Sequence, residues 1–378
     1  MREKIFLISP TIGDGGRARI VLNTAKALEK NYDVEIIVFT RRVVEYYCPY
    51  KITCINCFSS KKSPFVKAYY QLLRARRIAE LYKKNNPKAI IAFGDAANLA
   101  ISISTFLGVK KSVAAIHGFA EITNKRTISI LLKRVQRIIC ISKEMKIAIE
   151  EIYGKNEKLV TVENGYDIAQ ITKEGKEFAE LSNADINLIA MGRLSKVKGY
   201  ERMVLSFSNF LEKYPSAVLN ILGDGEQESQ LKEFVNRSGL SEKVYFYGKV
   251  DNPYAYLSKA DLLLLTSYNE GFPNVLIETL ACGTPIVSVD CQSGPREILQ
   301  KEYTSERIRG IVKGDYGVLV ESIDDNNRFA EVFSKAIQMI WEDKTLQKHY
   351  KELSFARAKE FDLNVFAKKM KRVIDSLH

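Results

Sequence analysis

The chain has 378 residues, of which 46% are hydrophobic and 27% are charged, a composition typical of a soluble globular protein with two or three domains. It contains no apolar run of about 18 residues, so no transmembrane helix is expected, and Met1 leads directly into an apolar strand without the features of a signal peptide. Six cysteines, including one isolated C-x-x-C at Cys54 and Cys57, favour reduced cytosolic thiols over a zinc site.

The formal net charge of +12 is distributed unevenly along the chain. Residues 1–165 contain 29 basic and 14 acidic side chains, whereas the remainder contains 28 basic and 31 acidic ones. The excess positive charge therefore predicts an anionic partner for the first part alone. We do not expect that partner to be nucleic acid, because the sequence has neither an aromatic-rich single-strand platform nor a recognition motif.

Strands and helices alternate along the first 165 residues. We expect strands at 4–9, 34–39, 52–55, 89–93, 112–116, 137–142 and 159–162, and helices at 18–29, 63–85, 96–107, 125–137 and 143–153. The first strand and helix are joined by a glycine-rich loop, in which Gly15 and Gly16 would let a phosphate approach the backbone. The third glycine of a dinucleotide fingerprint is missing, which argues against a nicotinamide oxidoreductase.

The same alternation resumes after a turn-rich segment at 163–167 and a linker or peripheral helix at 168–185. The second half is expected to have strands at 187–191, 217–222, 244–247, 262–265, 286–289 and 318–320, and helices at 200–213, 227–237, 253–258, 275–281, 327–343, 345–359 and 364–377. The pattern predicts an α/β protein with two doubly wound Rossmann-like domains that face each other across a cleft.

The segment 262–299 is the part of the chain richest in chemical information. An apolar strand ends in a polar loop with Glu270, and the next helix carries Glu278. The backbone N–H groups near Asn274, Val275 and Leu276, in the first helical turn, should favour an anion. With a phosphate there, Glu270 would be free for sugar hydroxyls and Glu278 could reach a ribose diol, which are the groups of a nucleotide diphosphate sugar in order.

This segment, Glu270-x7-Glu278 with GFPNVLIE inside it, resembles the signature of the retaining GT-B glycosyltransferases of family 4 (glycosyl transferases group 1). The flanking sequences GTPIV and SGPREI also fit. The glycine-rich loop is similar to the G-G-A-E-R loop of that family, with Arg19 at the arginine position. Ala18 stands where the family usually has glutamate, so this chain has no carboxylate there. The pair His117-Gly118 resembles the His-Gly that lines the cleft near the reacting sugar in many members.

No D-x-D, the sequence that commonly holds a bridging metal at a diphosphate, occurs in the chain. We therefore expect a metal-independent site with no cofactor. The resemblance implies a diphosphate clamp of Arg193 and Lys198, in which the arginine forks onto phosphate oxygens and the lysine supplies a point charge. The implied catalytic residues are His117, Arg193, Lys198 and Glu270. The implied donor-binding residues are Gly15, Gly16, Gly192, Gly248, Phe272, Pro273, Asn274, Val275, Leu276 and Glu278.

The resemblance further implies an acceptor-binding domain at 1–165, a nucleotide-sugar-binding domain at 166–360, and a last helix, 361–378, that crosses back to the first domain. The expected reaction transfers a hexose or N-acetylhexosamine with retention, from a UDP-sugar or alternatively GDP-mannose, to a hydroxyl of a lipid-linked or surface glycan. A sugar-nucleotide epimerase of the same fold is the other possibility, and it would need no acceptor.

Two basic segments, 61–77 and 125–137, interleave lysine and arginine with aromatic and aliphatic residues at helical spacing. This pattern is typical of a helix at a membrane interface. We therefore expect the first domain to dock peripherally on the anionic inner face of the plasma membrane. In the alternative interpretation, the apolar positions face the domain core and the charges only solvate it.

Overall fold

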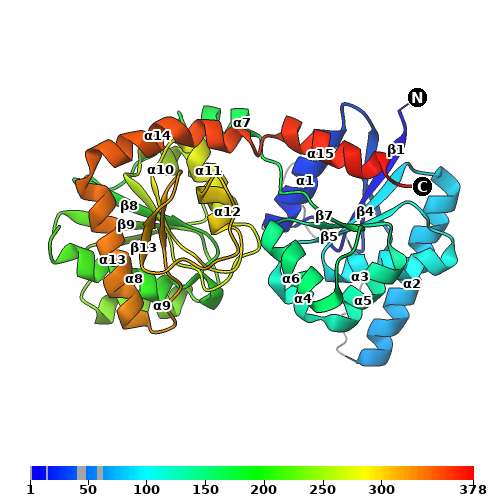
Figure 1. Cartoon of the computed structure of the whole chain (residues 1–378), viewed down its shortest axis with the longest axis horizontal. Helices are drawn as coiled ribbons and strands as arrows, with labels where there is room; N and C mark the ends of the chain where they lie inside the picture. Colours follow the sequence, from blue (N-terminus) through cyan, green and yellow to red (C-terminus); the bar gives the residue numbers. More distant parts are fainter. Residues whose placement is uncertain (1, 14–15, 41–47, 58–62) are drawn as a thin grey trace. The chain divides into compact units, whose positions relative to one another are not determined.

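The computed structural model describes residues 2–13, 16–40, 48–57 and 63–378. The chain forms two compact units: unit 1 comprises Met1–Tyr166 and Asp362–His378, and unit 2 comprises Asp167–Phe361. Within the described residues, each unit is built on a seven-stranded sheet covered by helices on both faces (Figure 1). In the same ranges, no helix combines the length and the apolar character that a bilayer span requires.

The sheet of unit 1 is parallel throughout. Its order is β3 (Lys51–Cys54), β2 (Asp33–Val38), β1 (Lys4–Ser9), β4 (Ala89–Phe93), β5 (Ser112–Ile116), β6 (Arg137–Cys140) and β7 (Leu159–Thr161). The strands are short apolar runs because a parallel sheet is buried on both faces. The strand order reverses between β1 and β4, so the loops after these strands lie at a topological switch point, where ligands bind in open α/β sheets.

Helices cover both faces of this sheet. One face is covered by α1 (Gly16–Leu28) and α15 (Leu363–Asp375), and the other by α2 (Pro64–Asn85), α3 (Asp95–Ser104) and α5 (Lys125–Arg134). The short α4 (Phe119–Thr123), α6 (Lys143–Tyr153) and the 3₁₀ turn η1 (Thr105–Leu107) complete the unit. The predicted helix 125–137 is wrong at its end, because Val135 is already extended and Arg137 begins β6.

Unit 2 repeats the plan with one antiparallel edge strand. Its order is β10 (Val244–Gly248), β9 (Ala217–Leu222), β8 (Ile186–Met191), β11 (Leu262–Leu265), β12 (Ile286–Val289), β14 (Val318–Val320) and the antiparallel β13 (Ile311–Lys313). One face is covered by α8 (Tyr200–Leu211), α9 (Glu228–Arg237) and α13 (Asn326–Glu342). The other face is covered by α7 (Ile168–Glu174), α10 (Pro253–Lys259), α11 (Asn274–Cys282) and α14 (Lys344–Lys359).

Three short elements of unit 2 were not predicted. They are β13, the 3₁₀ turn η2 (Lys196–Lys198) and α12 (Pro295–Leu299), none longer than five residues. The two helical elements are too short to show a helical period, and β13 is only partly buried, so it does not appear as an apolar run in the sequence.

The helix α15 returns to unit 1 at the end of the chain. Its first amide, of Leu363, donates to the carbonyl oxygen of Tyr166 at 3.0 Å. Phe366 lies in the core of unit 1 with Met370 and is 7% exposed. A Cβ on Gly165 would lie 2.6 Å from the Phe366 ring. Position 165 must therefore be glycine for α15 to pack this closely.

We predict that Phe366→Ala destabilises unit 1 by about 3 kcal/mol, the lower end for removing a buried phenylalanine side chain. Urea unfolding and amide hydrogen exchange of residues 363–377 would measure the effect. The matched control is Phe65→Ala, since Phe65 is 87% exposed in the same unit, and it should cost less than about 0.5 kcal/mol. Equal losses in the two variants would mean that α15 contributes nothing specific to unit 1.

Candidate functional site

Loops at the carboxyl ends of β8, β9 and β10 lie in close contact in unit 2. Gly192 follows β8, and a Cβ on Gly223 after β9 would lie 2.1 Å from the carbonyl oxygen of Gly192. The Gly223 amide donates to the carbonyl oxygen of Gly248, the last residue of β10, at 2.7 Å. Gly223 has φ +123°, a conformation that other residues rarely adopt. The predicted donor-site residues Gly192 and Gly248 are thus brought together by an unpredicted glycine.

Lys198 and Glu270 form an ion pair although 72 residues separate them. The Nζ of Lys198, at the end of η2, lies 2.6 Å from Oε1 of Glu270 in the loop after β11. The hydroxyl of Ser267 donates to the same oxygen, also at 2.6 Å. The Glu270 side chain is only 9% exposed and that of Lys198 is 25% exposed. A partly desolvated pair of this kind is fixed before any ligand arrives.

The backbone of Glu270 is fixed on both sides. Its amide donates to the carbonyl oxygen of Gln292 at 2.6 Å, and its carbonyl oxygen accepts from the Ser293 amide at 2.9 Å. The neighbouring Gly294 packs on Pro273, since a Cβ there would lie 2.6 Å from the proline Cδ. The SGPREI segment, noticed in the sequence only as a motif, therefore holds the Glu270 loop in place.

Arg202 is a site-supporting residue that the sequence did not reveal. Its side chain is fully buried, and it donates to the carbonyl oxygens of Thr266 at 2.6 Å and Ser267 at 2.7 Å. The guanidinium lies over the rings of Tyr268, at 3.9 Å, and Phe329, at 4.2 Å. Burial lowers the pKa of Arg202 to about 10, which still leaves the side chain charged at neutral pH.

The start of α11 offers fewer backbone donors than the sequence suggested. The amide of Leu276 donates to the carbonyl oxygen of Pro273 at 3.1 Å, so the prediction of a free N–H there is wrong. A tight turn of this type satisfies an orphan donor of the first helical turn. The side chains of Phe272, Val275 and Leu276 are at least nine-tenths buried, so they pack in the unit and contact a ligand chiefly through their backbone.

Glu278 lies in the second turn of α11 and is 2% exposed. The hydroxyl of Tyr254 in α10 donates to its Oε1 at 3.4 Å. Burial raises the pKa of the nearby Cys282 thiol to about 12, and the charge of Glu278 adds to the rise.

Arg193 is not joined to Lys198 and Glu270. Its guanidinium is 73% exposed and binds the carboxylate of Glu226, in the loop after β9, at 3.0 Å. The side chain of Lys198 lies beside the loop after β8 that carries Arg193, because a Cβ built on Gly192 would be 3.9 Å from Cε of Lys198. The pair with Glu226 uses Nε and Nη2 of the guanidinium, and an exposed pair of this kind costs little to break.

In unit 1, His117 follows β5 and packs against Phe93, with ring centroids 5.6 Å apart and nearly parallel planes. Both ring nitrogens lack a hydrogen-bond partner among the described residues. Burial, and to a smaller extent the charge of Arg17, lower the pKa of His117 to about 3, so the ring is neutral at physiological pH. Gly16 begins α1, whereas Gly15 lies outside the described residues.

A second titratable group, not predicted, lies beside His117. The carboxyl group of Glu121 accepts the backbone amide of His117 at 3.0 Å and an amide hydrogen of Asn98 at 3.4 Å. Burial, together with the neighbouring Asp95, raises the pKa of Glu121 well above its usual range. Arg17 also lies close, since a Cβ on Gly94 would be 3.0 Å from its Cζ. Unit 1 therefore has a cluster of polar groups at its strand ends.

Two Rossmann-like units, one with a lysine–carboxylate pair beside a helix start at its strand ends, define a GT-B-type glycosyltransferase. The chain belongs to this enzyme class by family as well: residues 172–352 match the model "Glycosyl transferases group 1" and residues 14–170 match "Glycosyltransferase Family 4". The family assignment made from Glu270-x7-Glu278 is confirmed, as is the α/β fold.

Two curated relatives are similar along nearly their whole length. An uncharacterized glycosyltransferase of Methanocaldococcus jannaschii is 28% identical, over 89% of this chain and 93% of its own. An N-acetylgalactosamine-N,N'-diacetylbacillosaminyl-diphospho-undecaprenol 4-alpha-N-acetylgalactosaminyltransferase of Campylobacter jejuni is 26% identical, over 95% and 96%. Among solved structures, Anabaena HepE in complex with UDP-glucose has a TM-score of 0.77 at 18% identity, over the full length of both chains.

We predict that the imidazole of His117 does not titrate between pH 8 and pH 5. Its pKa near 3 favours the neutral ring in the folded state, so stability contributed by this group is present above about pH 6.5 and is lost as the pH falls toward 3. With three histidines in the chain, ¹³C-histidine NMR can follow each ring, and the signal absent from His117→Gln identifies this one. A His117 signal that moves with a midpoint above pH 5 would contradict the prediction.

Proposed function

We propose that the enzyme transfers a hexose or N-acetylhexosamine from a UDP-sugar to a hydroxyl of a lipid-linked or surface glycan, with retention of configuration. The observation that carries the proposal is the Lys198–Glu270 pair at the strand ends of unit 2, beside the start of α11. A cation and a buried carboxylate at this point match the diphosphate and the sugar hydroxyls of such a donor. The solved relative from Anabaena binds UDP and UDP-glucose, which supports the choice of nucleotide.

The choice of acceptor rests on the relatives. The Campylobacter jejuni enzyme is named for a saccharide linked to diphospho-undecaprenol, and an enzyme of Erwinia amylovora for amylovoran biosynthesis. We therefore propose a role in polysaccharide biosynthesis. GDP-mannose remains the second choice of donor, and a sugar-nucleotide epimerase would share the donor site but would release no UDP in response to an acceptor.

In the proposed mechanism, the acceptor oxygen bonds to the anomeric carbon while the bond from that carbon to the diphosphate oxygen breaks. Lys198 and Arg193 stabilise the negative charge that develops on the leaving diphosphate, and the start of α11 adds backbone donors. The acceptor proton passes to the departing diphosphate, on the same face of the sugar. Glu270 orients sugar hydroxyls, and Glu278 binds the ribose.

We propose that no divalent metal takes part. The basis is the absence of a D-x-D sequence together with the presence of two basic residues, Arg193 and Lys198, suited to the diphosphate. The clamp therefore supplies the positive charge that a metal ion would otherwise provide.

We predict that Lys198→Ala and Arg193→Ala each lower acceptor-dependent UDP release by about tenfold to a thousandfold, as for loss of one donor to a transition-state charge. The assay uses a panel of UDP-sugars and GDP-mannose with a polyprenyl-diphosphate-linked saccharide, in the presence of EDTA. Lys213→Ala and Arg237→Ala, on the exposed surface of unit 2, serve as charge-matched controls.

Three outcomes of that assay would overturn parts of the proposal. Turnover near the wild-type rate in both clamp variants would remove the assignment of the diphosphate site. Interconversion of the nucleotide sugar without an acceptor would favour the epimerase. Activity that disappears in EDTA and returns with Mg²⁺ or Mn²⁺ would show that a metal is required.

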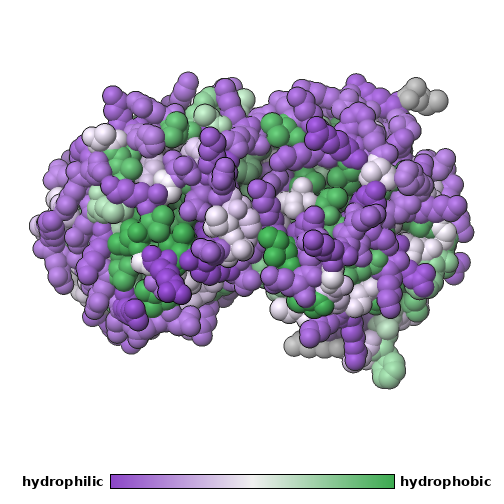
Figure 2. All heavy atoms as spheres, in the orientation of Figure 1, coloured by the Kyte–Doolittle hydropathy of each residue, from purple (hydrophilic) through white to green (hydrophobic). Residues whose placement is uncertain are grey.

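We also propose that unit 1 docks on an anionic membrane surface through α2. Phe65, Tyr69 and Leu72 follow one another at i, i+4 and i+7, and they are 87%, 61% and 59% exposed. This part of the helix extends away from the body of unit 1, and its free end carries hydrophobic surface (Figures 1 and 2). The interpretation in which this apolar stripe faces the core is therefore wrong for these three residues, although Ile78 and Ala79 further along do face the core.

The second basic segment is less suited to a membrane. In α5, Ile128 and Leu131 are buried and only Ile130 is exposed. In α2, Arg74 and Arg77 donate to the backbone carbonyl oxygens of Cys57 and Ile55, so these two arginines are structural. Lys61 and Lys62 lie outside the described residues. The docking surface of α2 is thus the apolar stripe with the exposed Lys67 and Arg76.

We predict that the protein sediments with anionic but not with neutral vesicles, and that high salt releases it. The triple variant Phe65→Ser, Tyr69→Ser, Leu72→Ser should bind anionic vesicles at least tenfold more weakly, because it removes three apolar anchors of an interfacial helix. Phe178→Ser, at a residue 85% exposed in unit 2, is the control and should bind like the wild type. Equal binding to both vesicle types, or binding to neither, would exclude this docking surface.

A further inference from the structure

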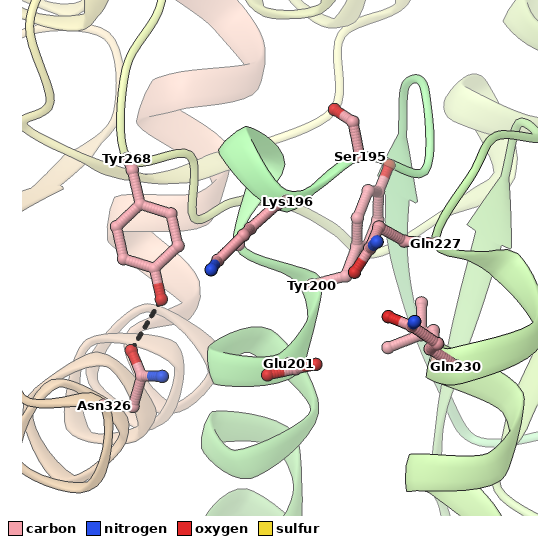
Figure 3. A pocket seen from close by; sticks show the side chains of 10 residues that line it. Ser195, Lys196, Tyr200, Glu201, Gln227, Gln230, Tyr268 and Asn326 are labelled. Atoms are coloured by element: carbon pink, nitrogen blue, oxygen red, sulfur yellow. Dashed lines mark hydrogen bonds between the residues drawn. The ribbon is translucent and has the colours of Figure 1, made fainter.

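A cavity of about 370 Å³ in unit 2 has no role in the proposed reaction. It lies between η2, the first turns of α8 and α9, and the start of α13, and it is drawn in Figure 3. Its volume is within the range of small-molecule sites. None of the predicted catalytic or donor-binding residues lines it. Lys196 contributes to its wall, whereas Lys198, two residues on, turns to Glu270.

The polar side chains around this cavity are accessible to a ligand, because Lys196, Glu201 and Gln230 are exposed and Gln227 is half-buried. Lys196, Glu201, Gln227 and Gln230 converge on it from η2, α8 and the start of α9 (Figure 3). Within the described residues, none of these four side chains has a hydrogen-bond or ion-pair partner. They present ammonium and amide donors beside carboxylate and amide acceptors. Such a mixture suits a ligand whose groups both donate and accept, as sugar hydroxyls do.

The charge of the lining argues against an anionic ligand. Lys196 and Glu201 are the ionised side chains among the residues that line the cavity, so the formal charge there is zero. Phosphate sites commonly add basic side chains, often a bidentate arginine, to the backbone donors of helix starts. The proposed diphosphate site, with Lys198 and Arg193, has that excess, and this cavity does not.

Tyr268 gives the cavity an aromatic wall. Its ring is 37% exposed, and its hydroxyl donates to Oδ1 of Asn326 at 2.8 Å, as the dashed line in Figure 3 shows. That bond uses the amide oxygen of Asn326 and leaves its two N–H donors for a ligand. An aromatic ring beside several polar side chains suits a ligand that has both an apolar face and hydroxyl groups, as a sugar has.

We infer that this cavity is a second saccharide site, which binds a neutral hexose or N-acetylhexosamine unit separately from the nucleotide sugar. The inference goes beyond the proposed transfer reaction and does not depend on it, because it rests on the lining of the cavity alone. Gln227 and Gln230 bind hydroxyls through paired amide donors and acceptors. Glu201 and Lys196 bind hydroxyls from the opposite side, and the Tyr268 ring packs against the apolar face of the sugar.

Saturation-transfer NMR on the full chain tests this inference. The probes are methyl α-glucoside, methyl α-galactoside, N-acetylglucosamine and, as an anionic comparison, glucose 1-phosphate, each with and without UDP. We expect at least one neutral probe to bind equally well with UDP present and no more weakly than glucose 1-phosphate. Gln230→Ala should weaken that binding about fivefold, the effect of losing one hydrogen bond. Gln338→Ala, on α13 away from the cavity, should not change it.

Other outcomes would overturn the inference. Loss of sugar binding on addition of UDP would assign the signal to the donor site. Binding of glucose 1-phosphate alone would show an anion site, and equal binding in Gln230→Ala and wild type, or no binding of any neutral probe, would leave the cavity without a saccharide. If UDP itself does not bind, the proposal of a UDP-sugar donor is contradicted. Binding of the neutral sugars can still be measured in that case, so the second saccharide site is tested independently.

Discussion

The buried guanidinium of Arg202 is the interaction on which the site of unit 2 depends. It binds three backbone carbonyl oxygens, those of Thr266, Ser267 and Ile323, which belong to the loops after β11 and β14. A buried cation is costly unless its donors are satisfied, and here carbonyl dipoles and two aromatic rings satisfy them. The same guanidinium fixes Ser267, which donates to Glu270, and Tyr268, which forms a wall of the neighbouring cavity. One side chain of α8 thus sets the geometry of two places at once.

Much of the fold follows from local patterns in the sequence. The apolar runs of β1, β4, β5, β9, β11 and β12 and the helix α6 have the bounds that the sequence predicts. These runs are recognisable because a parallel strand is buried on both faces and is flanked by turn residues. Two short elements were missed. The edge strand β13 is only partly buried, so it is not a buried apolar run like the others. The helix α12 has five residues, too few to show a helical period.

The site is predictable in its residue types but not in its pairings. Lys198 and Glu270 meet because β8 and β11 are neighbours in the sheet, a fact of topology that no local pattern contains. Arg193 pairs instead with Glu226, which carries no motif. Arg202 escaped notice because a basic residue on an amphipathic helix is usually exposed. The number of basic residues in unit 1 overstates the cations available to a membrane. Arg74 and Arg77 donate hydrogen bonds to backbone carbonyl oxygens within the unit.

The return of the chain to unit 1 has a consequence for how the protein is synthesised. Unit 2 is continuous in sequence, from Asp167 to Phe361, but unit 1 is assembled from Met1–Tyr166 and Asp362–His378. During translation, the sheet face that α15 covers therefore stays open while all of unit 2 emerges from the ribosome. The surface left open includes Ile20 and Thr24 of α1, which line one small cavity with Phe366 and Met370 of α15. The first unit to be made is thus the last to be completed, because its final helix is synthesised only after the whole of unit 2.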